Sequence, residues 1–208
     1  MLVSLPWASG LFRRDAHRPA AYLNILLTLL AFGHGSLILQ QVFQSGPVDL
    51  AFPWLTVADL ELDISFSLSL TNLVALELIT GLSLFSQVYS LGYMDKEWAL
   101  ARFFALLGFF EGAMSGVVLS DSLFQSYFLL EMLTLSTYLL VGFWYAQPLV
   151  VTAARDAFLT KRVGDVLLLM GVVALCSYSG AMGFNARYAG AAQDALSPWA
   201  ATLLGLGL

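Results

Sequence analysis

The sequence is poor in charged residues and in the residue types that build metal and redox centres. Asp, Glu, Lys and Arg make up only 11% of its 208 residues, whereas about 25% is usual in soluble proteins. The single cysteine, Cys176, excludes an internal disulfide, and no Cys/His cluster has the spacing of a metal site. We therefore expect this chain to bind no metal and no cofactor of its own.

Motifs for nucleotide, phosphate and nucleophilic sites are missing as well. The stretch GFNARYAG (183–190) lacks the GxGxxG spacing, and no Gly-rich phosphate loop or catalytic triad is present. The net charge is −5, and Lys and Arg occur only in short groups beside apolar runs. This pattern excludes a nucleic-acid partner and argues against a self-contained enzyme.

What the chain has in abundance is apolar residues, which form 59% of the sequence and indicate an integral membrane protein. A helix needs about 20 residues to cross the bilayer core, and runs of this kind predict a single all-α domain, a polytopic bundle. The predicted spans are 20–43, 64–91, 99–119, 122–144 and 163–178, with a further, incomplete one at 198–208. The basic cluster at 13–18 follows the first apolar stretch, so no cleaved signal peptide is expected.

Two segments between the spans predict different structures. Residues 45–63 combine two prolines, four acids and partial alternation of apolar and polar residues, which predicts a hairpin at the membrane surface. After Pro148, residues 150–158 predict a short interfacial helix that precedes the span at 163–178. The apolar stretches at 2–12 and 198–208 are too short to cross a bilayer, so we expect the chain to be a fragment.

The basic residues predict an orientation. If the spans alternate in direction, only Arg187 falls on the side of the hairpin. The remaining eight fall on the other side: Arg13, Arg14, Arg18, Lys96, Arg102, Arg155, Lys161 and Arg162. The positive-inside rule places that side in the cytoplasm or stroma, and the acidic hairpin opposite to it.

Three carboxylates, Glu77, Glu111 and Glu131, lie inside separate predicted spans. An acidic residue at the centre of a membrane helix costs about 2.5 to 3.5 kcal/mol unless it has a partner, water or a proton. Glu131 therefore has two open interpretations, a proton-transfer group or a structural carboxyl bonded to a neighbouring helix. Hydroxyls near it in sequence, including that of Tyr127, could pass protons or simply pack.

Two further polar features also have alternative interpretations. Arg162 and Asp165 are three residues apart, which predicts a local ion pair on one helix face; they are either anchors at the membrane edge or part of a functional network. His34, between Gly33 and Gly35, is either a hydrogen-bonded packing residue or a proton relay.

Four motifs in order resemble the fifth membrane subunit of complex I, the antiporter-like subunit that is called NdhF in cyanobacteria and chloroplasts. They are YSLGYM (89–94), ARFFALLGFFEGAMSGVVLSDSLF (101–124), FLLEMLTLSTYLLVGFW (128–144) and DAFLTKRVGDVLLLMG (156–171). The resemblance implies an antiporter-like fold with inverted repeats, of which this chain holds the N-terminal part. It also implies that Glu131 transfers protons with a lysine that would lie beyond Leu208, and that Lys161, Arg162 and Asp165 belong to its network.

Two departures from the common family pattern, Leu130-Glu131 and Ser136-Thr137-Tyr138, and the presence of Glu111, resemble specialised forms in cyanobacterial CO2-uptake complexes. That finer resemblance implies a thylakoid location and a peripheral CO2-hydrating partner beside the other membrane-arm subunits. Quinone and iron-sulfur clusters would then lie on other subunits. The alternatives are a subunit of a multisubunit sodium/proton antiporter and a non-pumping scaffold that docks the peripheral protein.

Overall fold

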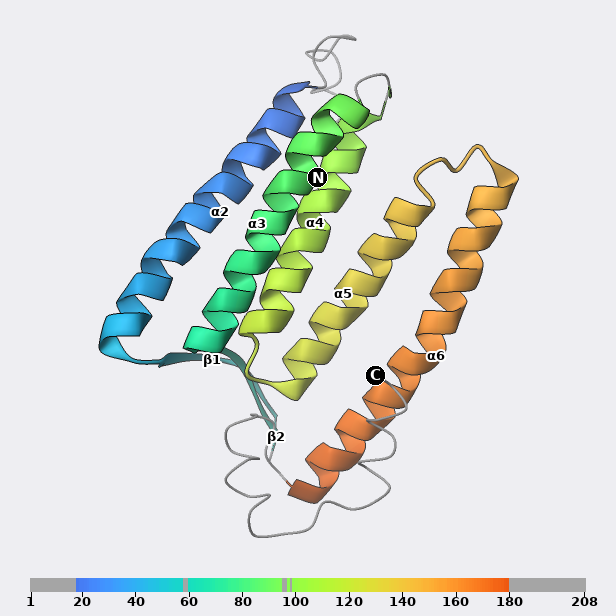
Figure 1. The fold of residues 1–208 in the computed structure, drawn as a ribbon. Coiled ribbons are helices and arrows are strands. Elements are labelled where there is room, and N and C mark those ends of the chain that lie inside the picture. Colours follow the sequence, from blue (N-terminus) through green and yellow to red (C-terminus); the bar gives the residue numbers. More distant parts are fainter. Residues whose placement is uncertain (1–17, 58–59, 95–96, 98, 180–208) are drawn as a thin grey trace.

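The computed structural model describes residues 18–57, 60–94, 97 and 99–179, which form five helices and one β-hairpin in these ranges. The order is α2 (Arg18–Ser45), β1 (Val48–Val57), β2 (Leu60–Leu68), α3 (Leu70–Tyr93), α4 (Leu100–Leu119), α5 (Leu123–Val141) and α6 (Pro148–Ser179). Successive helices run in opposite directions (Figure 1). The expected segments at 2–12 and 198–208 lie outside the described residues.

Helices α2 to α5 are each long and apolar enough to cross a membrane, by length and composition. Their apolar side chains point largely outward, as Leu30, Leu37, Leu78 and Phe85 do. Helix α2 packs on α3 and α4, α4 packs on α5, and α5 packs on α6. An outward-facing apolar surface around a polar seam is the arrangement of a membrane bundle, and the predicted all-α class is confirmed.

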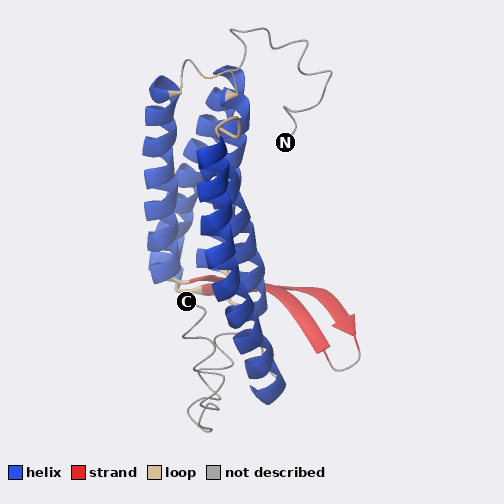
Figure 2. Cartoon of the chain, turned by 90° about the vertical axis from the view of Figure 1, so that its right-hand side faces the viewer, coloured by secondary structure: helices blue, strands red, loops and turns tan. Residues whose placement is uncertain are grey.

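The hairpin is longer than the sequence predicted. Strands β1 and β2 pair antiparallel from Val48↔Leu68 to Val57↔Leu60, with an irregularity at Pro53/Leu55, and they project from one end of the bundle (Figure 2). The predicted span at 64–91 was therefore wrong at its start, because 64–69 alternates apolar and serine residues, which is the period of a strand. The hydroxyl of Ser69 then accepts a hydrogen bond from the Asn72 N–H and caps α3.

Helix α6 differs from the prediction more strongly. Residues 150–158 form no separate interfacial helix, because one helix of 32 residues runs from Pro148 to Ser179. Pro148 fits the first helical position, where its missing N–H is not needed. Since α6 lies antiparallel beside α5, Lys161 and Arg162 sit part-way along a helix. They are not in a connection at the membrane edge, as the charge pattern had suggested.

Candidate functional site

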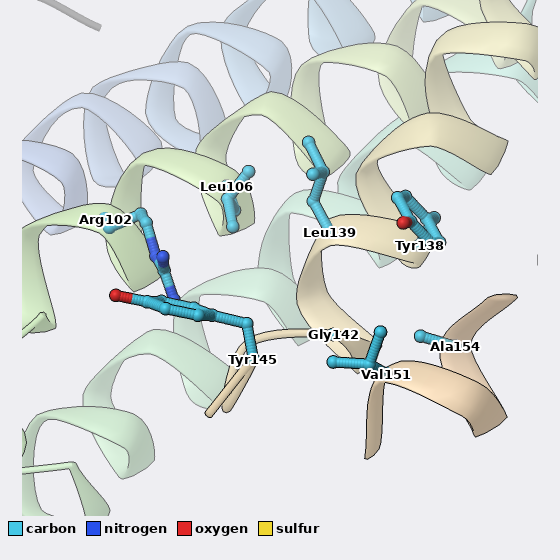
Figure 3. A pocket seen from close by; sticks show the side chains of 8 residues that line it. All are labelled: Arg102, Leu106, Tyr138, Leu139, Gly142, Tyr145, Val151 and Ala154. Atoms are coloured by element: carbon cyan, nitrogen blue, oxygen red, sulfur yellow. The ribbon is translucent and has the colours of Figure 1, made fainter. Parts of the chain in front are cut away.

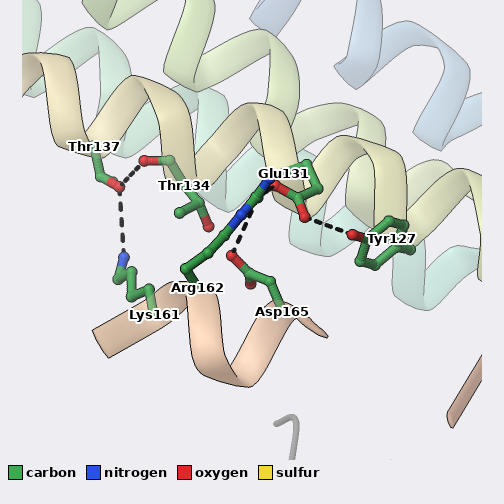
Figure 4. Close-up of polar contacts among 7 residues, drawn as sticks. All are labelled: Tyr127, Glu131, Thr134, Thr137, Lys161, Arg162 and Asp165. Atoms are coloured by element: carbon green, nitrogen blue, oxygen red, sulfur yellow. Dashed lines mark hydrogen bonds and ion pairs between the residues drawn. The ribbon is translucent and has the colours of Figure 1, made fainter. Parts of the chain in front are cut away.

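Glu131 of α5 is the centre of a polar cluster between α5 and α6 (Figure 4). The Arg162 guanidinium on α6 donates a hydrogen bond to Glu131 Oε2 and forms an ion pair with it. The Tyr127 hydroxyl, one helical turn before Glu131, donates to Oε1 at 2.6 Å. Both carboxylate oxygens therefore have a donor, one charged and one neutral.

Asp165 adds a second carboxylate to the cluster, so that the Arg162 cation lies near both Glu131 and Asp165. Its Oδ2 lies 4.0 Å from Arg162 Nη1 and is buried without a hydrogen-bond partner. The predicted pairing of Arg162 with Asp165 is therefore a loose contact, whereas the pairing with Glu131 is close. With one positive and two negative groups, the ionised cluster carries a net negative charge that a single proton would neutralise.

The cation of the cluster is more exposed than its two carboxylates. The Arg162 side chain is 47% exposed, against 19% for Glu131 and 16% for Asp165. Its guanidinium carbon also lies 5.9 Å from the centre of the Phe158 ring, within the range of a cation–π contact. Arg162 therefore has two carboxylates and an aromatic face within reach.

Lys161 does not reach Glu131. Its Nζ donates to Thr137 Oγ1 at 3.5 Å, and Thr137 lies six residues after Glu131 on α5. A cavity of about 70 Å³ lies here, bordered by Thr134, Thr137 and Lys161 among others. A cavity of this volume and partly polar lining has room for water.

Glu111 of α4 belongs to a different cluster, on the opposite side of the bundle. It is buried, and its Oε2 accepts hydrogen bonds from Thr28 (2.9 Å), Ser83 (2.8 Å) and Gln87 (2.8 Å). Among the described residues, no Lys, Arg or His forms an ion pair with it. The sequence did not indicate these three donors, although Ser83 and Gln87 are one turn apart on α3 and thus share a face.

The two remaining predicted positions lie apart from both clusters. Glu77 Oε2 accepts a hydrogen bond from the Ser36 hydroxyl at 2.9 Å. His34 is exposed, and within the described residues it makes no hydrogen bond or ion pair, so neither its packing nor its relay interpretation gains support there.

A second cavity is not part of these clusters. It measures about 330 Å³ and lies between α4, α5 and α6 near the loop after α5 (Figure 3). At its edge Arg102 Nη2 donates to the Phe143 carbonyl at 2.5 Å, and its guanidinium carbon lies 4.7 Å from the Phe143 ring and 5.0 Å from the Tyr145 ring. Arg102 thus fastens the loop to α4.

Two family models match the chain in succession. Residues 54–104 match the N-terminus of chain 5 of NADH-ubiquinone oxidoreductase (complex I), and residues 120–208 match the transmembrane region of NADH:quinone oxidoreductase and Mrp antiporter subunits. NAD(P)H-quinone oxidoreductase subunit 5, organellar chromatophore 2, of Paulinella chromatophora is 70% identical over 210 residues. The chain belongs to the complex I subunit 5 family.

This subunit 5 chain matches only a part of its relatives. It is covered completely by the Paulinella protein but spans 34% of that protein's length. The chloroplast subunit 5 of Chaetosphaeridium globosum is 35% identical over 164 residues, which is 79% of this chain and 24% of the relative.

Solved structures share the fold of this subunit 5 chain at low sequence identity. The Mrp complex of Dietzia sp. DQ12-45-1b matches with a TM-score of 0.72 at 19% identity, over 93% of this chain and 20% of that chain. The archaeal membrane-bound sulfane sulfur reductase matches with a TM-score of 0.71 at 16% identity, over 90% of this chain and 37% of that chain. The antiporter-like fold expected from the sequence is therefore confirmed.

Proposed function

We propose that the chain is the N-terminal part of a proton-translocating subunit in a membrane complex that passes electrons from NAD(P)H or ferredoxin to plastoquinone. The observation that carries this proposal is the Glu131–Arg162 ion pair between helices α5 and α6, with Asp165 as a second carboxylate for the same cation. The relatives named NAD(P)H-quinone oxidoreductase subunit 5 support the choice of complex. The other membrane-arm subunits are its proposed partners, and the quinone and iron-sulfur clusters lie on them.

The ion pair provides a way to couple charge movement to protonation. While Arg162 contacts Glu131, the positive charge favours the ionised carboxylate. When Arg162 moves toward Asp165 or the Phe158 ring, Glu131 loses that charge and takes up a proton instead. The Tyr127 hydroxyl, which donates to Oε1, orients the carboxyl group. A lysine on a later helix, as the family resemblance implies, would receive the proton.

The finer assignment is to the CO2-uptake form of the complex in a cyanobacterial-type thylakoid membrane. Hydration of CO2 to bicarbonate releases a proton, and buried Glu111, which lacks a basic partner among the described residues, is suited to accept it. We place the ends of α2, α4 and α6 that carry the basic residues on the cytoplasmic side. A peripheral CO2-hydrating protein is the proposed extra partner.

Glu131→Gln tests the proton-transfer role, because glutamine keeps the size and can still accept the Tyr127 hydrogen bond. In vesicles with the assembled complex, quinone-coupled proton uptake is expected to fall about 10²-fold or more, the usual contribution of a positioned proton-transfer group. Asp156→Asn is the matched control, since Asp156 is exposed and pairs only with Arg155 in the described structure. If the complex with Glu131→Gln assembles and pumps protons normally, the proton-transfer role is contradicted and the scaffold interpretation is supported.

The ion that is carried is tested in the same vesicles. The proposal expects uptake that is independent of sodium and abolished by a protonophore. Proton uptake that requires sodium and is accompanied by sodium movement in the opposite direction would instead support the sodium/proton antiporter alternative, and the fold of this chain is similar to that of the Mrp complex.

A further inference from the structure

Glu77 of α3 is an ionisable group inside the bundle that the proposed proton path does not use. Its Oε2 accepts the Ser36 hydroxyl at 2.9 Å, and the same hydroxyl lies 3.0 Å from the Phe32 carbonyl. Its other oxygen, Oε1, is buried and has no hydrogen-bond partner. An ionised oxygen that is removed from water and lacks a donor is costly, whereas a protonated one is not.

The space for this carboxyl group is made by Gly35 of α2. A Cβ atom at Gly35 would collide with Glu77 Oε1, and Gly35 itself is buried. The present position of the Glu77 carboxyl group therefore depends on glycine at this point, because any side chain there would displace it. Because Gly35 and Ser36 are neighbours, α2 contributes an opening for one oxygen of Glu77 and a hydroxyl for the other.

The charges around Glu77 do not compensate it. Among the side chains that the structure describes, the acidic, basic and histidine groups on the elements packed against α3 are His34 on α2, Arg102 and Glu111 on α4, and Asp63 on β2. In the described structure none of them forms an ion pair or hydrogen bond with Glu77. In this part of the chain, therefore, no described cation is paired with Glu77.

Glu77 lies between the Glu111 cluster and the hairpin. It is seven residues from the start of α3, about 10 Å along the helix, whereas Ser83 and Gln87, which bind Glu111, lie about 20 to 25 Å along it. The Phe32 ring packs against Gly81 between the two levels. The seam between α2 and α3 therefore holds two polar clusters that are separated by one aromatic side chain.

We propose that Glu77, with Ser36 and the opening at Gly35, is a proton-binding site through which the α2–α3 seam exchanges protons with the hairpin side of the membrane. Oε1 gains one proton, the carboxylate charge changes from −1 to 0, and no other bond forms or breaks. The site is separate from the Glu131–Arg162 pair and does not rest on its proposed role.

Infrared difference spectroscopy of the assembled complex, recorded across a pH titration in H2O and D2O, tests this proposal. A neutral carboxylic acid has a C=O stretching band that ionised carboxylates lack. In Glu77→Gln the intensity of this band is expected to decrease by the contribution of one carboxyl group. Gly35→Ala displaces the Glu77 carboxyl group from its opening and is expected to shift the frequency of its C=O band. Asp63→Asn, an exposed acid on the hairpin, should leave it unchanged.

The outcomes are distinct from those for Glu131. Loss of the band in Glu77→Gln, with the band retained in Glu131→Gln, supports the site. An unchanged band in Glu77→Gln overturns the proposal, as does a band in Gly35→Ala that matches wild type. If Glu77→Gln does not assemble, Ser36→Ala gives the same decision, because removal of the single hydroxyl donor must shift the band if Glu77 carries the proton.

Discussion

The three carboxylates inside the helices are accommodated in three different ways. Glu131 has a guanidinium and a tyrosine hydroxyl, Glu111 has three neutral donors on one oxygen, and Glu77 has one hydroxyl. An unpaired buried charge is far more costly than a paired one. The strength of compensation therefore decreases from Glu131 to Glu77, and with it the ease of keeping the group ionised.

Asp121, in the turn between α4 and α5, gives a residue-level prediction for pH dependence. Burial, and then the negative charge of Asp49 on β1, raise the pKa of this carboxyl above its usual value. The folded state therefore holds the proton more tightly than the unfolded state. Its contribution to stability is complete below the unfolded pKa, about 3.9, and is lost as the pH rises through the higher folded pKa.

Asp121→Asn removes this titration while it keeps the size of the side chain. The apparent unfolding temperature of the complex, measured from about pH 4 to about pH 7, is expected to fall less for the variant than for wild type, since only wild type acquires a charge at this position. An equal difference between the two proteins at every pH would contradict the prediction. Asp156→Asn, far from the hairpin, should run parallel to wild type.

At the scale of elements, the sequence predicted which segments are helical and missed where two of them begin. Apolar length predicted α2 to α5, because hydrocarbon thickness sets it. The start of α3 was misplaced because the apolar residues at 64, 66 and 68 look like a continuation of the hydrophobic run. They alternate with serine, however, and form the end of strand β2. Helix α6 was divided because Arg155, Lys161 and Arg162 resemble a membrane boundary, whereas α5 supplies Glu131 and Thr137 as partners for two of these cations.

In the candidate sites, too, the contacts between residues close in sequence could be predicted, and the contacts between distant residues could not. The i, i+3 relation of Arg162 and Asp165 is local and could be predicted, but the closer partner of Arg162 is 31 residues away. Thr28 and Glu111 are 83 residues apart. Contacts of this kind depend on which helices are neighbours and how each is rotated, which periodicity alone does not determine in helices that are apolar on nearly all sides.

The hairpin is fastened to the bundle by contacts that make an element-level prediction. The Ser65 N–H donates to Gln125 Oε1 at 2.9 Å, and the Asp121 N–H donates to the Ser65 carbonyl at 3.0 Å. Gln125→Ala removes the first of these bonds, which contributes about 0.5 to 1.5 kcal/mol. Amide hydrogen exchange at β2 is expected to accelerate roughly 2- to 12-fold.

Gln147→Ala provides the control for this change. Gln147 is exposed and lies in the loop at the opposite end of the bundle, where its backbone N–H, not its side chain, bonds to Trp144. Exchange at β2 should not change in this variant. Equal acceleration in both variants would mean that the Gln125 side chain does not hold the hairpin.

At the scale of the whole molecule, the antiparallel order of the helices places the hairpin and the loop after α5 at opposite ends of the bundle (Figure 1). Among the described residues, Arg18, Arg102 and Arg155 lie toward the end that carries the loop, and Asp49 and Asp63 lie in the hairpin. Lys and Arg are retained on the cytoplasmic side during membrane insertion. The loop after α5 should therefore face the cytoplasm, and the hairpin the opposite compartment.

Single cysteines can test this orientation in a Cys176→Ser background. Gln44, at the hairpin end of α2, and Ala146, in the loop after α5, are both exposed. In right-side-out thylakoid vesicles an impermeant maleimide is expected to label Ala146→Cys, and Gln44→Cys only after the membrane is opened by detergent. The reverse pattern would invert the orientation and move the proton exit proposed for Glu77 to the cytoplasmic side, whereas labelling of both positions from one side would contradict the antiparallel bundle.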